Sequence, residues 1–133
     1  MTTGTSDLHV AVEAAAARLT GYPDSVFFAT GYQANLSTLQ ALASPELTII
    51  SDARNHASII DGCRLAKASG ASLVVTAHRD TRAVEDALAT RATKYALVIT
   101  DGLFSMDGVL APLPELSRLA RDYGAWLLSL IHI

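Results

Sequence analysis

The sequence predicts a three-layer α/β/α fold in which a mainly parallel sheet carries helices on both faces. Short apolar runs alternate with longer stretches of helical periodicity, and the links between them are short. This alternation is typical of parallel strands joined through helices. No internal repeat or linker interrupts it, so we expect one unit or part of one. The expected strands cover residues 25–29, 47–51, 71–77, 95–100 and 125–131, and the expected helices cover 8–19, 31–43, 57–68, 81–89 and 114–123.

Residues that start or stop helices support the first elements. Ser6 or Asp7 can cap the first helix, and Gly21 follows its end, where a left-handed residue is common. The run SVFFA, residues 25–29, is short and apolar and predicts the first strand. Pro45 closes the second helix, because proline disfavours helical backbone in the residue before it.

The later elements carry similar signals. Gly70 ends the third helix, and Asp80 is well placed to cap the fourth. The run YALVIT, residues 95–100, is continuously apolar, which predicts a central strand buried on both faces. Residues 101–114 read as a loop, and Pro114 suits the first turn of the last helix.

Composition narrows the class of function. Half of the 133 residues are hydrophobic and the formal net charge is −3, so we expect no nucleic-acid partner and no acidic membrane partner. The sequence shows no secretory signal and no apolar run of membrane-spanning length. The single cysteine, Cys63, rules out an internal disulfide and fits a reducing cytoplasm. Its surroundings predict a small buried hydrophobe.

Polar residues and glycines gather where the expected strands end. In sheets of this kind ligands bind outside the carboxyl ends of the strands, so these residues are candidates for a site. They are Thr30, Gly31 and Tyr32 after the first strand, Asp52, Asn55, His56 and Ser58 after the second, His78 and Asp80 after the third, and Asp101, Gly102, Ser105, Asp107 and Gly108 after the fourth.

Taken singly, these residues leave alternatives open. Gly31 and Tyr32 open a helix whose N–H groups could bind an anion, but a helix cap followed by a turn explains the same pattern. His56 could lie against a planar ligand, or it could simply stand at a helix start. No second His or Cys has metal-ligand spacing, and Ser105 lacks the G-x-S-x-G context of a hydrolase. We therefore expect neither a metal site nor a hydrolase.

Four segments together resemble one enzyme family. The chain is similar to the α-oxoamine synthases, which are fold-type-I enzymes that depend on pyridoxal 5′-phosphate (PLP). The likeness extends to about Leu127 and is greatest to the members that act in biotin synthesis, with the glycine C-acetyltransferases as the close alternative. The segments that carry it, in chain order, are GTSDLHVAVEAAAARLTGY, FFATGYQANLSTLQAL, SDARNHASIIDGCRL and TDGLFSMDGVLAPLPEL.

The resemblance implies five cofactor-binding residues. It implies that His56 stacks on the pyridine ring of the cofactor and helps to place the substrate, and that Gly31 and Tyr32 hold the phosphate. Ser105 matches a serine near the phenolic oxygen of the cofactor. Asp101 stands where many members have glutamate, so a carboxylate is kept.

The reaction that the resemblance implies is a decarboxylating condensation of an amino acid with an acyl thioester of coenzyme A or acyl carrier protein. In biotin synthesis the substrates would be L-alanine and a pimeloyl thioester. The resemblance further implies a homodimer, and we expect it in the cytoplasm because of the single cysteine. His9 and Asn35 also match family positions, and their roles stay open.

Two family features are not found in this sequence. Neither Lys67 nor Lys94 matches the lysine that forms the Schiff base, and residues 128–133 replace the stretch that holds the aspartate for the pyridinium nitrogen. We expect residues 1–127 to be part of a PLP-dependent transferase large domain that is inactive alone. We expect residues 128–133 to be a non-native tail, because a transposon-end adaptor encodes the same residues. The alternative from another class is a non-catalytic α/β module that binds phosphate-bearing ligands.

Overall fold

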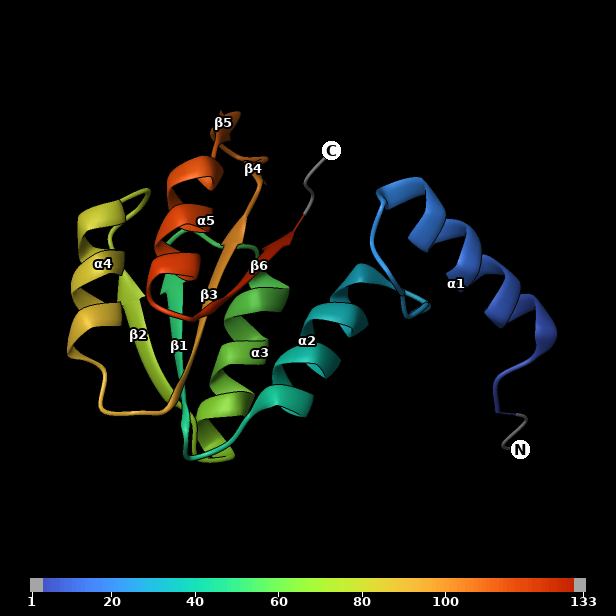
Figure 1. Ribbon diagram of the computed structural model, residues 1–133, viewed down its shortest axis with the longest axis horizontal. Coiled ribbons are helices and arrows are strands. Elements are labelled where there is room, and N and C mark those ends of the chain that lie inside the picture. The colour runs from blue at the N-terminus through green and yellow to red at the C-terminus, as the bar shows by residue number, and fades with distance from the viewer. Residues whose placement is uncertain (1–3, 131–133) are drawn as a thin grey trace. The chain divides into compact units, whose positions relative to one another are not determined.

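A parallel sheet with helices on both faces forms the body of the structure (Figure 1). The computed structural model describes residues 4–130, which fall into two units, one up to Ala34 and one from Asn35 onward, and each is described by itself. The helices are α1 (Asp7–Thr20), α2 (Gly31–Leu42), α3 (Ala57–Ala68), α4 (Thr81–Thr90) and α5 (Leu113–Asp122). The strands are β1 (Leu47–Asp52), β2 (Ser72–Thr76), β3 (Tyr95–Asp101), β4 (Leu103–Phe104), β5 (Val109–Leu110) and β6 (Trp126–Leu130).

The main sheet has the strand order β2-β1-β3-β6, and every neighbouring pair is parallel. The strand predicted to be central is β3, which lies between β1 and β6. The register sets Ser51 beside Ile99 and Asp101 beside Leu130. The carboxyl ends of β1, β3 and β6 therefore meet at the same end of the sheet, where the candidate residues stand.

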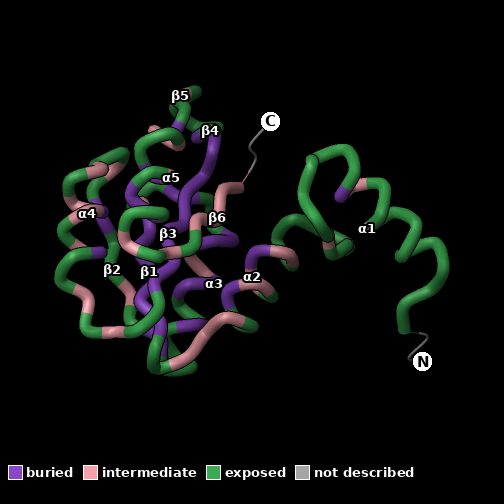
Figure 2. Tube along the Cα trace, viewed as in Figure 1, coloured by how far each residue is buried: buried purple, intermediate pink, exposed green. Residues whose placement is uncertain are grey.

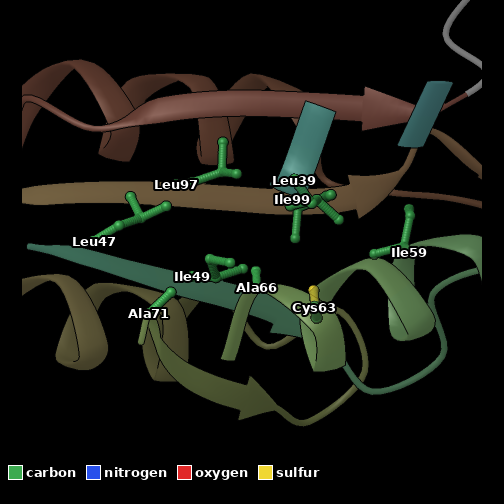
Figure 3. Close-up of a cluster of buried hydrophobic side chains, with 9 residues drawn as sticks. All are labelled: Leu39, Leu47, Ile49, Ile59, Cys63, Ala66, Ala71, Leu97 and Ile99. Carbon is green, nitrogen blue, oxygen red and sulfur yellow. The ribbon is translucent and has the colours of Figure 1, made fainter. Parts of the chain in front are cut away.

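Helices lie on both faces of the sheet, as the three-layer prediction requires, and bury its two central strands, β1 and β3. Side chains alternate along β1 and β3, so successive residues enter opposite cores. The core under α2 and α3 contains Leu39, Leu47, Ile49, Ile59, Cys63, Ala66, Ala71, Leu97 and Ile99 (Figure 3). The core under α4 and α5 contains Ile50, Val84, Leu88, Ala96, Val98, Leu116 and Leu119. Figure 2 shows that β1 and β3 are the most continuously buried part of the chain.

A glycine brings α2 and α3 into close contact. Gly62 is buried in α3, and a Cβ atom at this position would lie 2.5 Å from Cδ1 of Leu39. The same Cβ would lie 3.4 Å from the carbonyl oxygen of Asn35. Asn35 and Ser58 stand one helical turn before Leu39 and Gly62, so the close packing also sets the distance between them.

Helix α1 begins at a cap formed by two side chains. The backbone N–H of Ser6 donates to Nδ1 of His9 over 3.2 Å, and the Ser6 hydroxyl lies 2.7 Å from the same nitrogen. This contact gives His9 a capping role in the first turn. The helix ends at Gly21, which takes the left-handed φ of 74° that the sequence predicts.

The prediction of a strand over residues 25–29 is wrong, because the structure has no strand there. The segment pairs with α1 through side chains instead: the Ser25 hydroxyl donates to the Glu13 carbonyl over 2.7 Å, and the Phe27 N–H donates to Oε1 of Glu13 over 3.0 Å. Val26 is 71% exposed. An apolar run is not sufficient for a strand, because a strand must also find a neighbour for its backbone groups.

The loop predicted over residues 101–114 is not wholly irregular. It contains the antiparallel pair β4 and β5, in which Phe104 stands opposite Val109. Gly108 adopts a φ of 66° in the connecting turn and donates its N–H to the Phe104 carbonyl over 2.8 Å. Strands of two residues are too short to show an alternating pattern in the sequence.

The other predicted elements agree with the structure to within one residue at each end over the part that is described. Residues 128–130 of the expected tail continue β6 beside β3, and residues 131–133 lie outside the described residues. Between residues 4 and 130, no helix combines the length and the apolar character needed to cross a membrane.

Candidate functional site

A cavity of about 530 Å³ lies at the carboxyl ends of β1 and β3. Its walls come from the loop after β1 and from the β4–β5 hairpin, two segments that the sheet brings together. Three of the five cofactor-binding residues that the resemblance implies, His56, Asp101 and Ser105, line this cavity. The other lining residues are Arg54, Asn55, Ala57, Phe104, Met106 and Asp107.

Asn55 joins the ends of β1 and β3. Its side-chain amide donates to the Ser51 hydroxyl and to the Ile99 carbonyl, each over 2.9 Å. Its side-chain oxygen accepts from the backbone N–H of Asp101, also over 2.9 Å. Asn55 is 4% exposed, and these bonds satisfy a buried amide that would otherwise be costly. The loop leaves the sheet at a fixed point for this reason.

The Asp101 carboxylate holds the backbone of His56. Its two oxygens lie 3.1 and 3.3 Å from the His56 nitrogen and accept its N–H. Burial raises the pKa of Asp101 above the ordinary value for aspartate, and the neighbouring Asp52 charge adds to this rise. The hydrogen bond and the charge of His56 oppose it in part. Perturbed carboxyl groups of this kind are common at functional sites.

His56 stands directly before α3 and keeps its imidazole exposed at the cavity. Its backbone is extended, with φ −51° and ψ 146°, and its Nδ1 accepts the N–H of Ser58 over 3.2 Å. This cap sets the direction of the side chain. An exposed imidazole face can cover one face of a planar ligand, because aromatic systems stack.

Asp52 ties the loops after β1 and β2 together. Its Oδ1 accepts the Arg54 N–H over 2.8 Å and lies 3.0 Å from Nδ1 of His78. Its Oδ2 accepts the Arg79 N–H over 2.7 Å. The His78 ring meets the Phe104 ring edge to face, with centroids 4.4 Å apart, so the hairpin joins the same arrangement.

The two walls of the cavity also meet through an ion pair. Nη1 of Arg54, from the loop after β1, lies 2.6 Å from Oδ2 of Asp107, in the turn between β4 and β5. The two side chains are 60% and 35% exposed. Solvent therefore screens the pair, and its contribution to stability is at most about 1 kcal/mol.

Gly31 and Tyr32 form the first turn of α2 and belong to the unit that ends at Ala34. Thr30 caps this turn, because its hydroxyl oxygen accepts the Gln33 N–H over 3.1 Å. A Cβ atom at Gly31 would meet no atom within 4 Å, so the helix start is open on that side. This geometry suits an anion and suits a plain cap equally, so the phosphate role stays a prediction.

Neither lysine of the chain lines the cavity. Lys67 is exposed in the last turn of α3. Lys94 directly precedes β3, at the opposite end of the sheet, where its Nζ lies 4.9 Å from the centre of the Tyr95 ring. Within residues 4–130, no group of three His, Cys, Asp or Glu side chains is arranged to hold a metal ion.

Some residues that build this site had no assigned role in the sequence. Asn55 and Ser58 stood out only as polar residues at a strand end, although the run S-D-A-R-N-H-A-S before a helix is the signal that could have drawn attention to them. Arg54 and Asp107 are 53 positions apart in the sequence, and no local pattern links them.

Comparison with known proteins identifies the family. The model of the family "Aminotransferase class I and II" matches residues 1–129. The biotin biosynthesis bifunctional protein BioWF of Cutibacterium acnes is 51% identical over 94% of this chain and 19% of its own length. An 8-amino-7-oxononanoate synthase of Methylococcus capsulatus is 50% identical over 94% of this chain and 32% of its own length. Another 8-amino-7-oxononanoate synthase, from Mycobacterium sp. (strain KMS), is 46% identical over 96% of this chain and 33% of its own length.

Solved structures share the fold. A serine palmitoyltransferase from S. paucimobilis, with PLP and myriocin bound, is 35% identical with a TM-score of 0.87, over 97% of this chain and 33% of that one. An 8-amino-7-oxononanoate synthase from Francisella tularensis is 28% identical with a TM-score of 0.72, over 95% and 35%. The chain thus spans about a third or less of the curated relatives described above. With the sheet, the helices on both of its faces and the family match in agreement, this chain belongs to the aminotransferase class I and II family.

Proposed function

We propose that this chain is part of a PLP-dependent 8-amino-7-oxononanoate synthase, which condenses L-alanine with a pimeloyl thioester in biotin synthesis. The names of the similar proteins support the pathway. The observation that carries the proposal is the placement of His56, which is exposed at a cavity of about 530 Å³ and held there through its backbone by Asp101. A cavity of this size is within the range of small-ligand sites.

The residues of the cavity fit PLP. The cofactor needs a flat surface, hydrogen-bond donors and a place for its phosphate, and the cavity offers the His56 ring and the Ser105 hydroxyl. When bound, PLP supplies an electron sink to the reacting α-carbon. In our proposal His56 covers one face of the pyridine ring and helps to place the substrate, while Ser105 lies near the phenolic oxygen. Gly31 and Tyr32 hold the phosphate through the start of α2.

In our proposal Asp101 is also a cofactor-binding residue and positions His56 as well, and Asn55 supports Asp101. The Asp101 carboxylate accepts the backbone N–H of His56. The backbone N–H of Asp101 in turn donates to the side-chain oxygen of Asn55. Such a series of hydrogen bonds restricts the His56 ring to one position. This matters because small displacements of a positioned group reduce reaction rates strongly.

The Schiff-base lysine of the proposed enzyme lies, in our proposal, in a part of the complete protein beyond these 133 residues. The support is that neither Lys67 nor Lys94 lines the cavity and that the relatives are about three times longer or more. We further propose that the complete protein acts as a cytoplasmic homodimer, with no membrane or nucleic-acid partner, on an amino acid and an acyl thioester.

The proposal is tested with the complete protein that carries this chain. Release of coenzyme A is measured with L-alanine and pimeloyl-CoA, and in parallel with glycine and acetyl-CoA, because a glycine C-acetyltransferase would prefer the second pair. His56→Ala is expected to lower turnover strongly, and His56→Phe, which keeps a flat ring, is expected to keep PLP binding better than His56→Ala. PLP binding without turnover on any acyl thioester would contradict the proposed synthase.

A further inference from the structure

A hydrogen-bond chain runs behind His56, from α2 through α3 to the imidazole ring. Nδ2 of Asn35 donates to the Ser58 hydroxyl over 2.8 Å, and the same hydroxyl lies 2.7 Å from Nδ1 of His56. The Ser58 backbone N–H also points at Nδ1, over 3.2 Å. Ser58 is fully buried and Asn35 is 6% exposed, so water cannot readily replace either partner.

The donors and acceptors in these hydrogen bonds determine which ring nitrogen of His56 carries the hydrogen. An amide nitrogen can only donate, so the Ser58 oxygen accepts from Asn35 and its one hydrogen is free to be donated to Nδ1. The backbone N–H of Ser58 can also only donate. Nδ1 of His56 therefore accepts the backbone N–H, and an acceptor at Nδ1 leaves the Ser58 hydroxyl hydrogen as its second donor. The neutral ring then carries its hydrogen on Nε2.

The close contact between α2 and α3 allows the hydrogen bond between Asn35 and Ser58 to form. Because Gly62 has no side chain, α2 approaches α3 closely enough for Asn35, a short residue, to reach Ser58. The cap geometry holds the other end, since the His56 backbone is fixed by Asp101. The ring is thereby restrained from both its backbone and its Nδ1 atom.

We infer that Asn35 and Ser58 are positioning residues that hold His56 as its Nε2–H tautomer and fix the plane of its ring. The assignment of the tautomer rests on the hydrogen bonds alone. Its importance for the reaction rests on the proposed function, in which this ring lies against the cofactor. The inference gives a role to Asn35, which sequence analysis left open.

A second histidine in the same unit provides an internal contrast. Nδ1 of His78 lies 3.0 Å from the Asp52 carboxylate, which can only accept. His78 must therefore carry a hydrogen on Nδ1, the reverse of His56. The two rings should give opposite nitrogen patterns in one sample.

The test is nitrogen NMR of the histidine rings in the complete protein, labelled with ¹⁵N-histidine and measured near neutral pH. The His56 signals are identified by their loss in His56→Phe, and the His78 signals by their loss in His78→Gln. We expect the His56 Nδ1 signal far downfield of Nε2, as for an unprotonated nitrogen, while His78 shows a protonated Nδ1. A hydrogen on Nδ1 of His56 would overturn the inference.

Two variants test whether Asn35 and Ser58 cause this state. Asn35→Asp replaces the amide donor by an acceptor of the same shape, so the Ser58 hydroxyl can turn toward it, and Nδ1 of His56 then keeps only the Ser58 backbone N–H as a donor, which should shift the Nδ1 signal. Ser58→Ala removes the hydroxyl but keeps the backbone N–H of residue 58, so the hydrogen should stay on Nε2 while Nδ1 loses one donor and its signal shifts. In both variants, unchanged ring signals of His78 show that the fold is kept. Unchanged His56 signals in both variants would overturn the role of the two residues.

The inference and the proposed function can fail separately. If the complete protein binds no PLP, the proposed function fails, and the His56 signals still decide the tautomer. If PLP binds and turnover occurs while His56 carries its hydrogen on Nδ1, the inference fails and the function stands. When both hold, Ser58→Ala should lower kcat/KM by about 10- to 100-fold, as expected for a displaced positioning contact.

Discussion

The backbone N–H of Asp101 donates to the side-chain oxygen of Asn55 over 2.9 Å. Regular pairing of β1 with β3 ends at Ser51 and Ile99, so this side chain continues the ladder two residues beyond the last backbone pair. The chain can therefore turn away from the sheet toward α3 without leaving the end of β3 unpaired. Asn55, which also lines the cavity, thereby joins the loop after β1 to the end of β3.

Replacing Asn55 should destabilise the protein more than its size suggests. Asn55→Ala leaves the Asp101 N–H and the Ile99 carbonyl buried without partners, and each such group costs about 1–3 kcal/mol. We expect a loss of about 2–4 kcal/mol in the free energy of unfolding, measured with urea. Gln40→Ala, at an exposed position of α2, serves as the control and should change it by less than about 0.5 kcal/mol. An equal effect of the two substitutions would contradict the role of Asn55.

Adding a methyl group at Gly62 should also destabilise the protein, although alanine favours helices. The new Cβ would overlap Cδ1 of Leu39, which is fully buried, so this side chain would have to shift within the core. Overpacking costs about 1–3 kcal/mol, and the gain in helix propensity of about 1 kcal/mol offsets only part of it. A double-mutant cycle with Leu39→Ala decides the cause, because removing the clashing atoms should make Gly62→Ala favourable. A clash elsewhere would leave its cost unchanged in that background.

The raised pKa of Asp101 predicts how stability changes with pH. The folded protein binds the Asp101 proton more tightly than the unfolded chain does, so its contribution to stability is greatest below the ordinary aspartate pKa of about 3.9. The contribution falls as pH rises from there through the folded pKa. Asp101→Asn keeps an oxygen acceptor for the His56 N–H but cannot ionise.

The free energies of unfolding of wild type and Asp101→Asn are compared from about pH 4 to about pH 7, where the ordinary aspartate pKa sets the lower end. Relative to the variant, the wild type should lose stability as pH rises. If the wild type gains stability instead, the folded protein stabilises the ionised Asp101 carboxylate. The hydrogen bonds to this carboxylate then outweigh the effect of its burial.

Cys63 should react slowly with thiol reagents. Burial raises the pKa of its thiol, and a hydrogen bond from Ser51 lowers it only in part, so little reactive thiolate forms. Alkylation of the complete protein, followed by mass spectrometry of the peptide that contains Cys63, should show slow labelling in buffer and rapid labelling in urea. Rapid labelling of the folded protein would mean that α3 opens readily.

Features that depend on local sequence were predictable, and those that depend on distant partners were not. Asp80 caps α4 as predicted, because a cap needs only the next turn, where it accepts the Ala83 N–H over 3.0 Å. The segment 25–29 has a strand-like sequence but takes its hydrogen bonds from α1. Whether such a segment becomes a strand depends on neighbours that its own residues do not reveal.

The same distinction holds at the cavity. His56, Asp101 and Ser105 could be singled out because residues after neighbouring parallel strands must lie close together. The contact between Asn35 and Ser58 could not, because it spans 23 positions and depends on how closely two helices pack. The sequence contains the cause, a glycine at position 62, but many helices contain a glycine that makes no such contact.

The ion pair between Arg54 and Asp107 joins two walls of the cavity only weakly. An exposed ion pair of at most about 1 kcal/mol favours the joined arrangement by only about fivefold over the separated one. Loop segments exchange within about nanoseconds to microseconds, whereas typical enzymes turn over only about ten times per second. The two side chains therefore separate and rejoin far faster than a typical enzyme turns over, so this contact between two walls of the cavity is transient.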